Sequence, residues 1–301
     1  MDKIIYFFTG IKNIEKFDYK IFFSKSFTNR NKKEIIYFDN LPIPYLWTRV
    51  FLFMLGLSLV SFLNTIYVGV YAFPWLTLIA ASVIPMTFTV FFYEIMKDKI
   101  IGIGKAIIIF FIATTLSLFI VGQINFGVSD FVDTVMIAPL IEEFAKMFTI
   151  YIVIKNVKAK KVSQGVFIGF LVGAGFQIAE TMGYATIWGI NGLIRSQSID
   201  YTVLFRRSAH AFMSHALFGA LHGMGIILSI RLKNNVWIKI SLLALVSHMA
   251  WNFVAVMMLP SFFEESLFIL IDLLFIPCFF MLLNVSLYDD KSVIIEDVMI
   301  N

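Results

Sequence analysis

The 301-residue chain has few cysteines and few charged residues for its length. Cys278 is the single cysteine, so a framework of intrachain disulfides is excluded. Charged residues make up 15% of the chain, where soluble domains average about 25%. Hydrophobic residues make up 59%, and the net charge is only +4, so nothing indicates nucleic-acid binding. This composition is typical of a polytopic membrane protein.

Several common catalytic signatures are also missing. The chain has no His-Glu-x-x-His helix of the zincin type and no Gly-x-Ser-x-Gly nucleophile elbow. Cys278 lies in an apolar run without a polar neighbour in sequence, so it is not a paired cysteine nucleophile. Any metal site must therefore form from residues that are distant in sequence.

The apolar segments of the chain are long enough to cross a hydrocarbon core about 30 Å thick. We predict an all-α, polytopic transmembrane bundle of about eight spanning helices. The predicted segments are 50–72, 75–96, 101–121, 132–154, 164–190, 209–230, 236–259 and 266–287.

Lysine and arginine in the short loops indicate the orientation, because these residues favour the cytoplasmic side. An N-in, C-in arrangement places Lys97, Lys99, Lys155, Lys158, Lys160, Lys161, Arg231 and Lys233 inside. It leaves only Arg195, Arg206 and Arg207 outside. The predicted organisation is a cytosolic N-terminal segment 1–45, a membrane domain 46–290 with its core at about 130–255, and a cytosolic tail 291–301.

One predicted segment carries three ionisable residues within five positions. The run Glu142-Glu143-Phe144-Ala145-Lys146 lies in the middle of 132–154. Each such side chain near the bilayer centre costs about 2.5–3.5 kcal/mol even on the most permissive insertion scale. Glu142 and Lys146 lie four residues apart, so we expect Lys146 to neutralise Glu142, while Glu143 points about 100° away. This free-energy cost indicates that the three side chains either pair with other polar groups or have a function.

Other polar side chains fall within the later segments. They are Glu180, His210, His215, His222, His248, Asn252 and Asp272. Helical rise places Glu142, Glu143 and His248 near mid-bilayer, with Glu180 about 4–5 Å and His215 about 7 Å to the outer side of their segment centres. Four helices are therefore expected to bring carboxylates and imidazoles into one layer. His222 falls below this layer, where it is a packing residue, a residue behind the ligands or a third ligand, and no role follows for His210 or Asp272.

Two kinds of chemistry use this combination of residues. In one, His215, His248 and a carboxylate such as Glu180 hold a divalent metal such as Zn²⁺, and a second carboxylate accepts the proton of water. In the other there is no metal, a glutamate deprotonates water, and Asn252 with a histidine stabilises the oxyanion. Both end in hydrolysis of an amide bond inside the membrane, and the residues leave the choice between them open.

Four ordered motifs resemble those of the PrsW family of intramembrane proteases. The first is Glu142-Glu143-Phe144-Ala145-Lys146, which looks like Glu-Glu-x-x-Lys. The second has Phe176 four residues before Glu180 and Tyr184 four residues after it. The third is Arg207 followed by Ser214-His215-Ala216-Leu217-Phe218-Gly219, and the fourth is His248-Met249-Ala250-Trp251-Asn252. The resemblance covers about 130–255, with one motif per helix.

The resemblance implies that Glu142, Glu143, His215 and His248 are catalytic and that Asn252 assists them. Lys146, Glu180 and Arg207 would support this set. The wider superfamily includes CAAX prenyl endopeptidases and bacteriocin-processing or immunity membrane proteins. The resemblance to the PrsW family also implies site-1-type cleavage of a membrane-anchored protein, such as an anti-sigma factor, by a multi-pass protein of the bacterial cell membrane. Which of Glu142 and Glu143 is the general base stays open.

Two other functions are compatible with buried glutamate, lysine and histidine. One is a proton-coupled transporter or ion pathway, because such residues also form proton relays in membranes. The other is a non-catalytic scaffold or immunity protein that keeps the fold of the superfamily. The chain shows no second half that mirrors the first, as many transporters do, and its set of Glu, His and Asn is intact.

Overall fold

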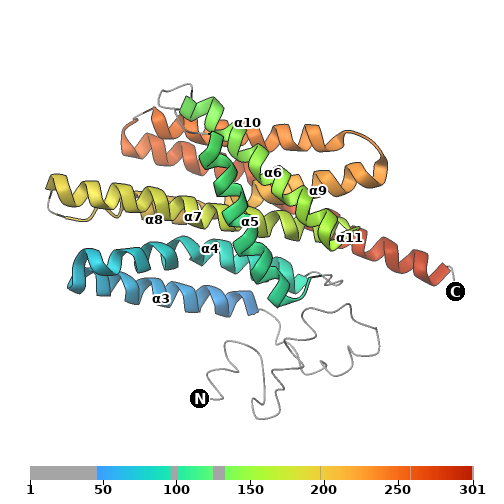
Figure 1. The fold of residues 1–301 in the computed structure, drawn as a ribbon, viewed down its shortest axis with the longest axis horizontal. Helices are drawn as coiled ribbons and strands as arrows, with labels where there is room; N and C mark the ends of the chain where they lie inside the picture. The colour runs from blue at the N-terminus through green and yellow to red at the C-terminus, as the bar shows by residue number, and fades with distance from the viewer. Residues whose placement is uncertain (1–45, 96–100, 125–132, 197, 258, 300–301) are drawn as a thin grey trace, which may run out of the picture. The chain divides into compact units, whose positions relative to one another are not determined.

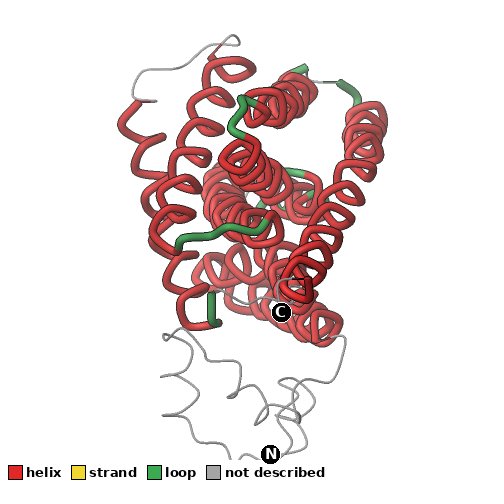
Figure 2. The backbone as a smooth tube through the Cα atoms, turned by 90° about the vertical axis from the view of Figure 1, so that its right-hand side faces the viewer, coloured by secondary structure: helices red, strands yellow, loops and turns green. Residues whose placement is uncertain are grey.

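The computed structural model describes residues 46–95, 101–124, 133–196, 198–257 and 259–299. The predicted N-terminal segment 1–45 lies outside these residues. The described part of the chain is helical and contains no strand (Figure 1), and short loops join the helices (Figure 2).

The helices follow one another closely along the chain. The first part contains α3 (Leu46–Val68), η3 (Gly69–Ala72), α4 (Phe73–Ile95) and α5 (Ile103–Ile124). The middle part contains η4 (Asp133–Ile137), α6 (Ala138–Val157), α7 (Val162–Ser196) and α8 (Thr202–Ala209). The last part contains η5 (Ala211–Met213), α9 (His215–Leu232), α10 (Val236–Val256) and α11 (Ser261–Met299).

Each of the eight predicted segments overlaps one long α-helix. In chain order these helices are α3, α4, α5, α6, α7, α9, α10 and α11. Among the described residues, six stretches are long and apolar enough to cross a membrane. The number is smaller than eight because η3 joins α3 and α4 into one apolar stretch, Leu46–Glu94, and because α6 carries Glu142, Glu143 and Lys146. The count of eight spans and the N-in, C-in orientation remain predictions.

The chain forms two compact units, and helices α5 and α7 contribute to both. The first unit comprises the described residues of Met1–Ile108 together with Glu180–Ser208. In it, α3 packs along α4, and the Glu94 carboxylate accepts the backbone N–H groups of Leu46 (2.9 Å) and Trp47 (3.0 Å). This contact satisfies two donors at the N-terminus of α3 that have no partner within the helix. The apolar core of the unit is Phe73, Leu76, Ala80, Ala185 and Leu204.

The second unit comprises the described residues of Ile109–Ala179 and Ala209–Asn301, and in it α6, α9 and α10 contact one another. Its α7 portion approaches α9 at backbone distance. A Cβ on Gly165 would lie 2.5 Å from the Gly223 carbonyl oxygen, and one on Gly169 would collide with the Gly219 carbonyl. Small residues at this spacing allow two helix backbones to pack closely in a membrane. The site described below lies in this unit.

Replacing Gly169 with alanine tests this close approach. We expect Gly169→Ala to lower the stability by about 1–3 kcal/mol, because the new methyl group meets backbone that cannot move aside as a side chain would. Thermal unfolding in detergent measures the effect. Gly183→Ala is the control, since a Cβ at Gly183 on the same helix meets nothing within 4 Å. Equal melting temperatures for the two variants would contradict the packing described here.

Candidate active site

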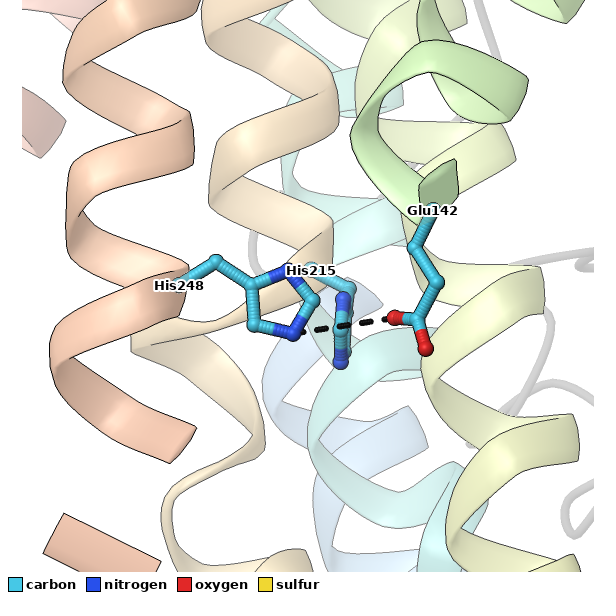
Figure 3. Close-up of side chains that lie close together, drawn as sticks. All are labelled: Glu142, His215 and His248. Carbon is cyan, nitrogen blue, oxygen red and sulfur yellow. Dashed lines mark ion pairs between the residues drawn. The ribbon is translucent and has the colours of Figure 1, made fainter. Parts of the chain in front are cut away.

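Three buried side chains converge from three helices of the second unit (Figure 3): Glu142 on α6, His215 on α9 and His248 on α10. One ligand atom from each lies within 4.8 Å of the other two. His248 Nε2 is 3.6 Å from Glu142 Oε2. The three residues lie 33 to 106 positions apart in the sequence, so the helix packing alone brings them together.

Local sequence features place two of the three residues, Glu142 and His215. Pro139 lies in the first turn of α6, where its missing N–H costs nothing, so the helix begins shortly before Glu142. Ser214 has φ −126° and ψ −139°, so the chain leaves helical geometry there and α9 begins at His215. The Ser214 hydroxyl donates to Gln177 Oε1 at 2.6 Å, which ties this turn to α7. The sequence interpretation did not single out Gln177, although a glutamine in an apolar segment was a signal for it.

The Glu143 carboxylate is the most heavily bonded group of the site. Its Oε1 accepts from Lys146 Nζ and lies 2.8 Å from His248 Nδ1. Its Oε2 lies 2.8 Å from His222 Nε2. A carboxylate only accepts, so His248 donates from Nδ1, and its Nε2 is then directed toward Glu142. Glu143 thus contacts His248 at Nδ1, and Glu142 lies on the Nε2 side of the same ring.

Lys146 is fully buried between Glu143 and His215. Its Nζ lies 2.6 Å from His215 Nδ1 and 4.8 Å from the centre of the Phe176 ring. The prediction that Lys146 neutralises Glu142 was wrong, because the ion pair is with Glu143, three residues away. Residues three and four apart are both neighbours on a helix, so spacing alone could not choose between the two glutamates.

The other predicted site residues lie as follows. Arg207 pairs with Glu180 at 2.6 Å and lies 4.8 Å from the Tyr184 ring, all within the first unit. Asn252 is half-buried one helical turn after His248 on α10. His210 lies between two carboxylates of α11, 2.5 Å from Asp272 and 3.4 Å from Glu265. Of the three candidate ligands, His215 and His248 come together with Glu142, and Glu180 forms its ion pair with Arg207 instead.

The convergent group fits a divalent metal by its chemistry. Two imidazoles and one carboxylate are a donor set found in catalytic zinc sites, which keep a further position open. The contact of His248 with the carboxylate of Glu143 is also typical, since metal-binding histidines usually donate their other N–H to a carboxylate or carbonyl. The residues present are therefore compatible with metal binding.

Comparison with protein families is consistent with this geometry. The matching family model is the PrsW family intramembrane metalloprotease, over residues 74–283, which is well over half of the chain. The chain belongs to the PrsW family. Comparisons with curated proteins and with solved structures found no match. As a PrsW member with six apolar stretches, the chain is an integral multi-pass membrane protein of a peptidase family, so the resemblance seen in its four motifs is confirmed.

Removing the charge of Lys146 tests the buried ion pair. We expect Lys146→Met to lower the free energy of unfolding by about 3–5 kcal/mol, because it leaves Glu143 as a buried charge without its cation. Denaturant unfolding in detergent measures this loss. Lys155→Met is the control, since Lys155 is exposed on the same helix. The double variant Glu143→Gln with Lys146→Met should recover part of the loss, and a double variant no more stable than Lys146→Met would contradict the pairing.

Proposed function

We propose that this PrsW member hydrolyses a peptide bond of a membrane-anchored protein, with Glu142, His215 and His248 as the groups that meet the reacting atoms. The observation that carries the proposal is the convergence of these three buried side chains within 4.8 Å. Burial of three such groups in apolar helices is costly unless they bind something or react. A peptidase uses this kind of set, because hydrolysis needs a proton acceptor beside an electrophilic or ligating group.

In the proposed mechanism, Glu142 accepts the proton of water as the water oxygen attacks the scissile carbonyl carbon. The tetrahedral intermediate then collapses, the C–N bond breaks, and Glu142 returns the proton to the leaving amine nitrogen. The products are a carboxylic acid, which keeps the second proton of the water, and an amine, so the atoms balance. Glu142 suits this role better than Glu143, because both oxygens of Glu143 contact buried donors of the protein.

A divalent ion such as Zn²⁺, held by His215 and His248 beside the Glu142 carboxylate, would supply Lewis acidity that polarises the carbonyl and makes water easier to deprotonate. Other side chains of the protein orient the two histidines. Glu143 orients His248 through Nδ1, and Lys146 contacts His215 Nδ1. Asn252, one turn from His248, is proposed to donate to the developing oxyanion. Positioning of this kind precedes the reaction and therefore lowers its barrier.

The proposed substrate is a membrane-anchored protein, such as an anti-sigma-like regulator, cleaved near its extracytoplasmic side. The lipid bilayer supplies both the environment of the enzyme and the anchor of the substrate. This proposal rests on the family, on the outward depth of His215 and Glu180 expected from the sequence, and on the N-in, C-in orientation predicted from the loops. The bacterial cell membrane is the proposed location.

Substitution of the three convergent residues tests the peptidase. We expect Glu142→Gln, His215→Ala and His248→Ala each to lower cleavage by roughly 10²–10⁴-fold, because each removes a group that touches the reacting atoms. Purified variants are incubated in liposomes with single-span membrane peptides, and fragments are counted by mass spectrometry. Glu264→Gln in the first turn of α11 is the matched control. Cleavage by Glu142→Gln at the wild-type rate would overturn the proposal, and an inert wild type would point to a non-catalytic scaffold.

Metal content distinguishes the two routes to hydrolysis. We expect about one zinc ion per purified chain, measured by elemental analysis, because the site offers one set of three donors. His215→Ala should lose the ion, and a chelator should stop cleavage until zinc is returned. The exposed-site variant Lys155→Met should keep the ion. Full cleavage by metal-free protein would instead favour activation of water by Glu142 alone.

A further inference from the structure

His222 is an imidazole of the second unit that the proposed mechanism does not use. It lies on α9 two helical turns after His215 and is buried, with 1% of its surface exposed. Both ring nitrogens have partners: Nε2 is 2.8 Å from Glu143 Oε2, and Nδ1 is 2.9 Å from Ser241 Oγ. A buried ring nitrogen without a hydrogen-bond partner would cost free energy of folding. The two contacts of His222 therefore allow this polar ring to be buried beside the site.

The partners of His222 come from two of the helices that pack on α9. Glu143 belongs to α6, and Ser241 belongs to α10. The Ser241 hydroxyl also lies 3.8 Å from the sulfur of Met147 on α6. The contacts continue through Glu143 Oε1 to His248 Nδ1 at 2.8 Å, and His248 Nε2 is 3.6 Å from Glu142. The order of groups is therefore Ser241, His222, Glu143, His248 and Glu142.

We propose that His222 is a positioning residue of this peptidase, which fixes the Glu143 carboxylate so that its other oxygen orients His248 toward Glu142. This inference rests on the proposed function. His222 does not touch the convergent group; it acts through Glu143. Ser241 holds the His222 ring from the other side, so that Nε2 points at the carboxylate.

The physical need for His222 follows from the freedom of a glutamate side chain. Lys146 and His248 both engage Glu143 Oε1, so they leave rotation about the last bond of the side chain weakly restrained. The contact at Oε2 is the one that sets the plane of the carboxylate. Without it, Oε2 is a buried acceptor with no donor, and the carboxylate turns toward whatever donor it can reach. His248 then loses a fixed orientation, and misplacement of about 1 Å is enough to lose 10²-fold in rate.

Two substitutions separate positioning from packing, because they place an amide at different ring positions. The amide of His222→Gln reaches the place of Nε2 and keeps a donor for Glu143. The amide of His222→Asn matches Nδ1, so it keeps the contact with Ser241 and loses the one with Glu143. His222→Leu fills the space and keeps neither contact.

The experiment measures zinc affinity by competition with a chelator, and kcat and KM on a membrane peptide that the wild type cleaves. We expect His222→Asn and His222→Leu to lose roughly 10–100-fold in zinc affinity and in kcat, with KM little changed, because groups behind metal ligands have effects of this size. His222→Gln should stay close to the wild type. Melting temperatures in detergent show whether all three variants are folded.

The outcomes are distinct. His222→Leu with wild-type zinc affinity and kcat overturns the proposal, and so does a His222→Gln as impaired as a folded His222→Asn, since either result makes His222 a packing residue. Normal cleavage by the wild type in those cases leaves the peptidase itself intact. A wild type that neither cleaves nor binds zinc overturns the proposed function and this inference together.

Discussion

The structure of the second unit depends on one buried carboxylate. Glu143 sits among apolar helices, where an uncompensated charge would cost several kcal/mol. It is satisfied by Lys146 from its own helix, His222 from α9 and His248 from α10. Because these donors come from three helices, the carboxylate can be stabilised only when the helices are packed in one arrangement. The same contacts then fix where Glu142, His215 and His248 point.

The glycines of α7 support the same packing by allowing α7 to lie close against α9. Gly165 and Gly169 let α7 approach α9 at the distance of backbone contact, and Gln177 on α7 bonds the Ser214 turn that precedes His215. His215 therefore has a rigid support at the first residue of its helix. Catalytic groups held by packed helices in this way are more finely placed than groups on loops. The cost of burying so many polar groups is offset by the hydrogen bonds and ion pairs that they form with one another.

The two adjacent glutamates illustrate how one pattern divides into two roles. They follow each other in sequence and lie about 100° apart on the helix, so they necessarily face different neighbours. Glu143 faces lysine and histidine donors, while Glu142 faces the two imidazoles whose other nitrogens contact Glu143 and Lys146. We interpret the first as the organiser of the site and the second as the reacting carboxylate. This division follows from the neighbours and not from the motif, which treats the two residues alike.

The sequence by itself determined the helical class and the family, and it singled out the polar residues that meet in the second unit. Long apolar segments can only be helices in a bilayer, and polar groups within them stand out because they are costly there. Only the tertiary structure decided which groups meet. Spacing on one helix allowed Lys146 to pair with either glutamate. The depths expected from the sequence did not show that His222 contacts Glu143, or that Glu142 and not Glu180 joins His215 and His248. The physical reason is that helical periodicity fixes directions within one helix, whereas contacts between helices depend on how their surfaces pack.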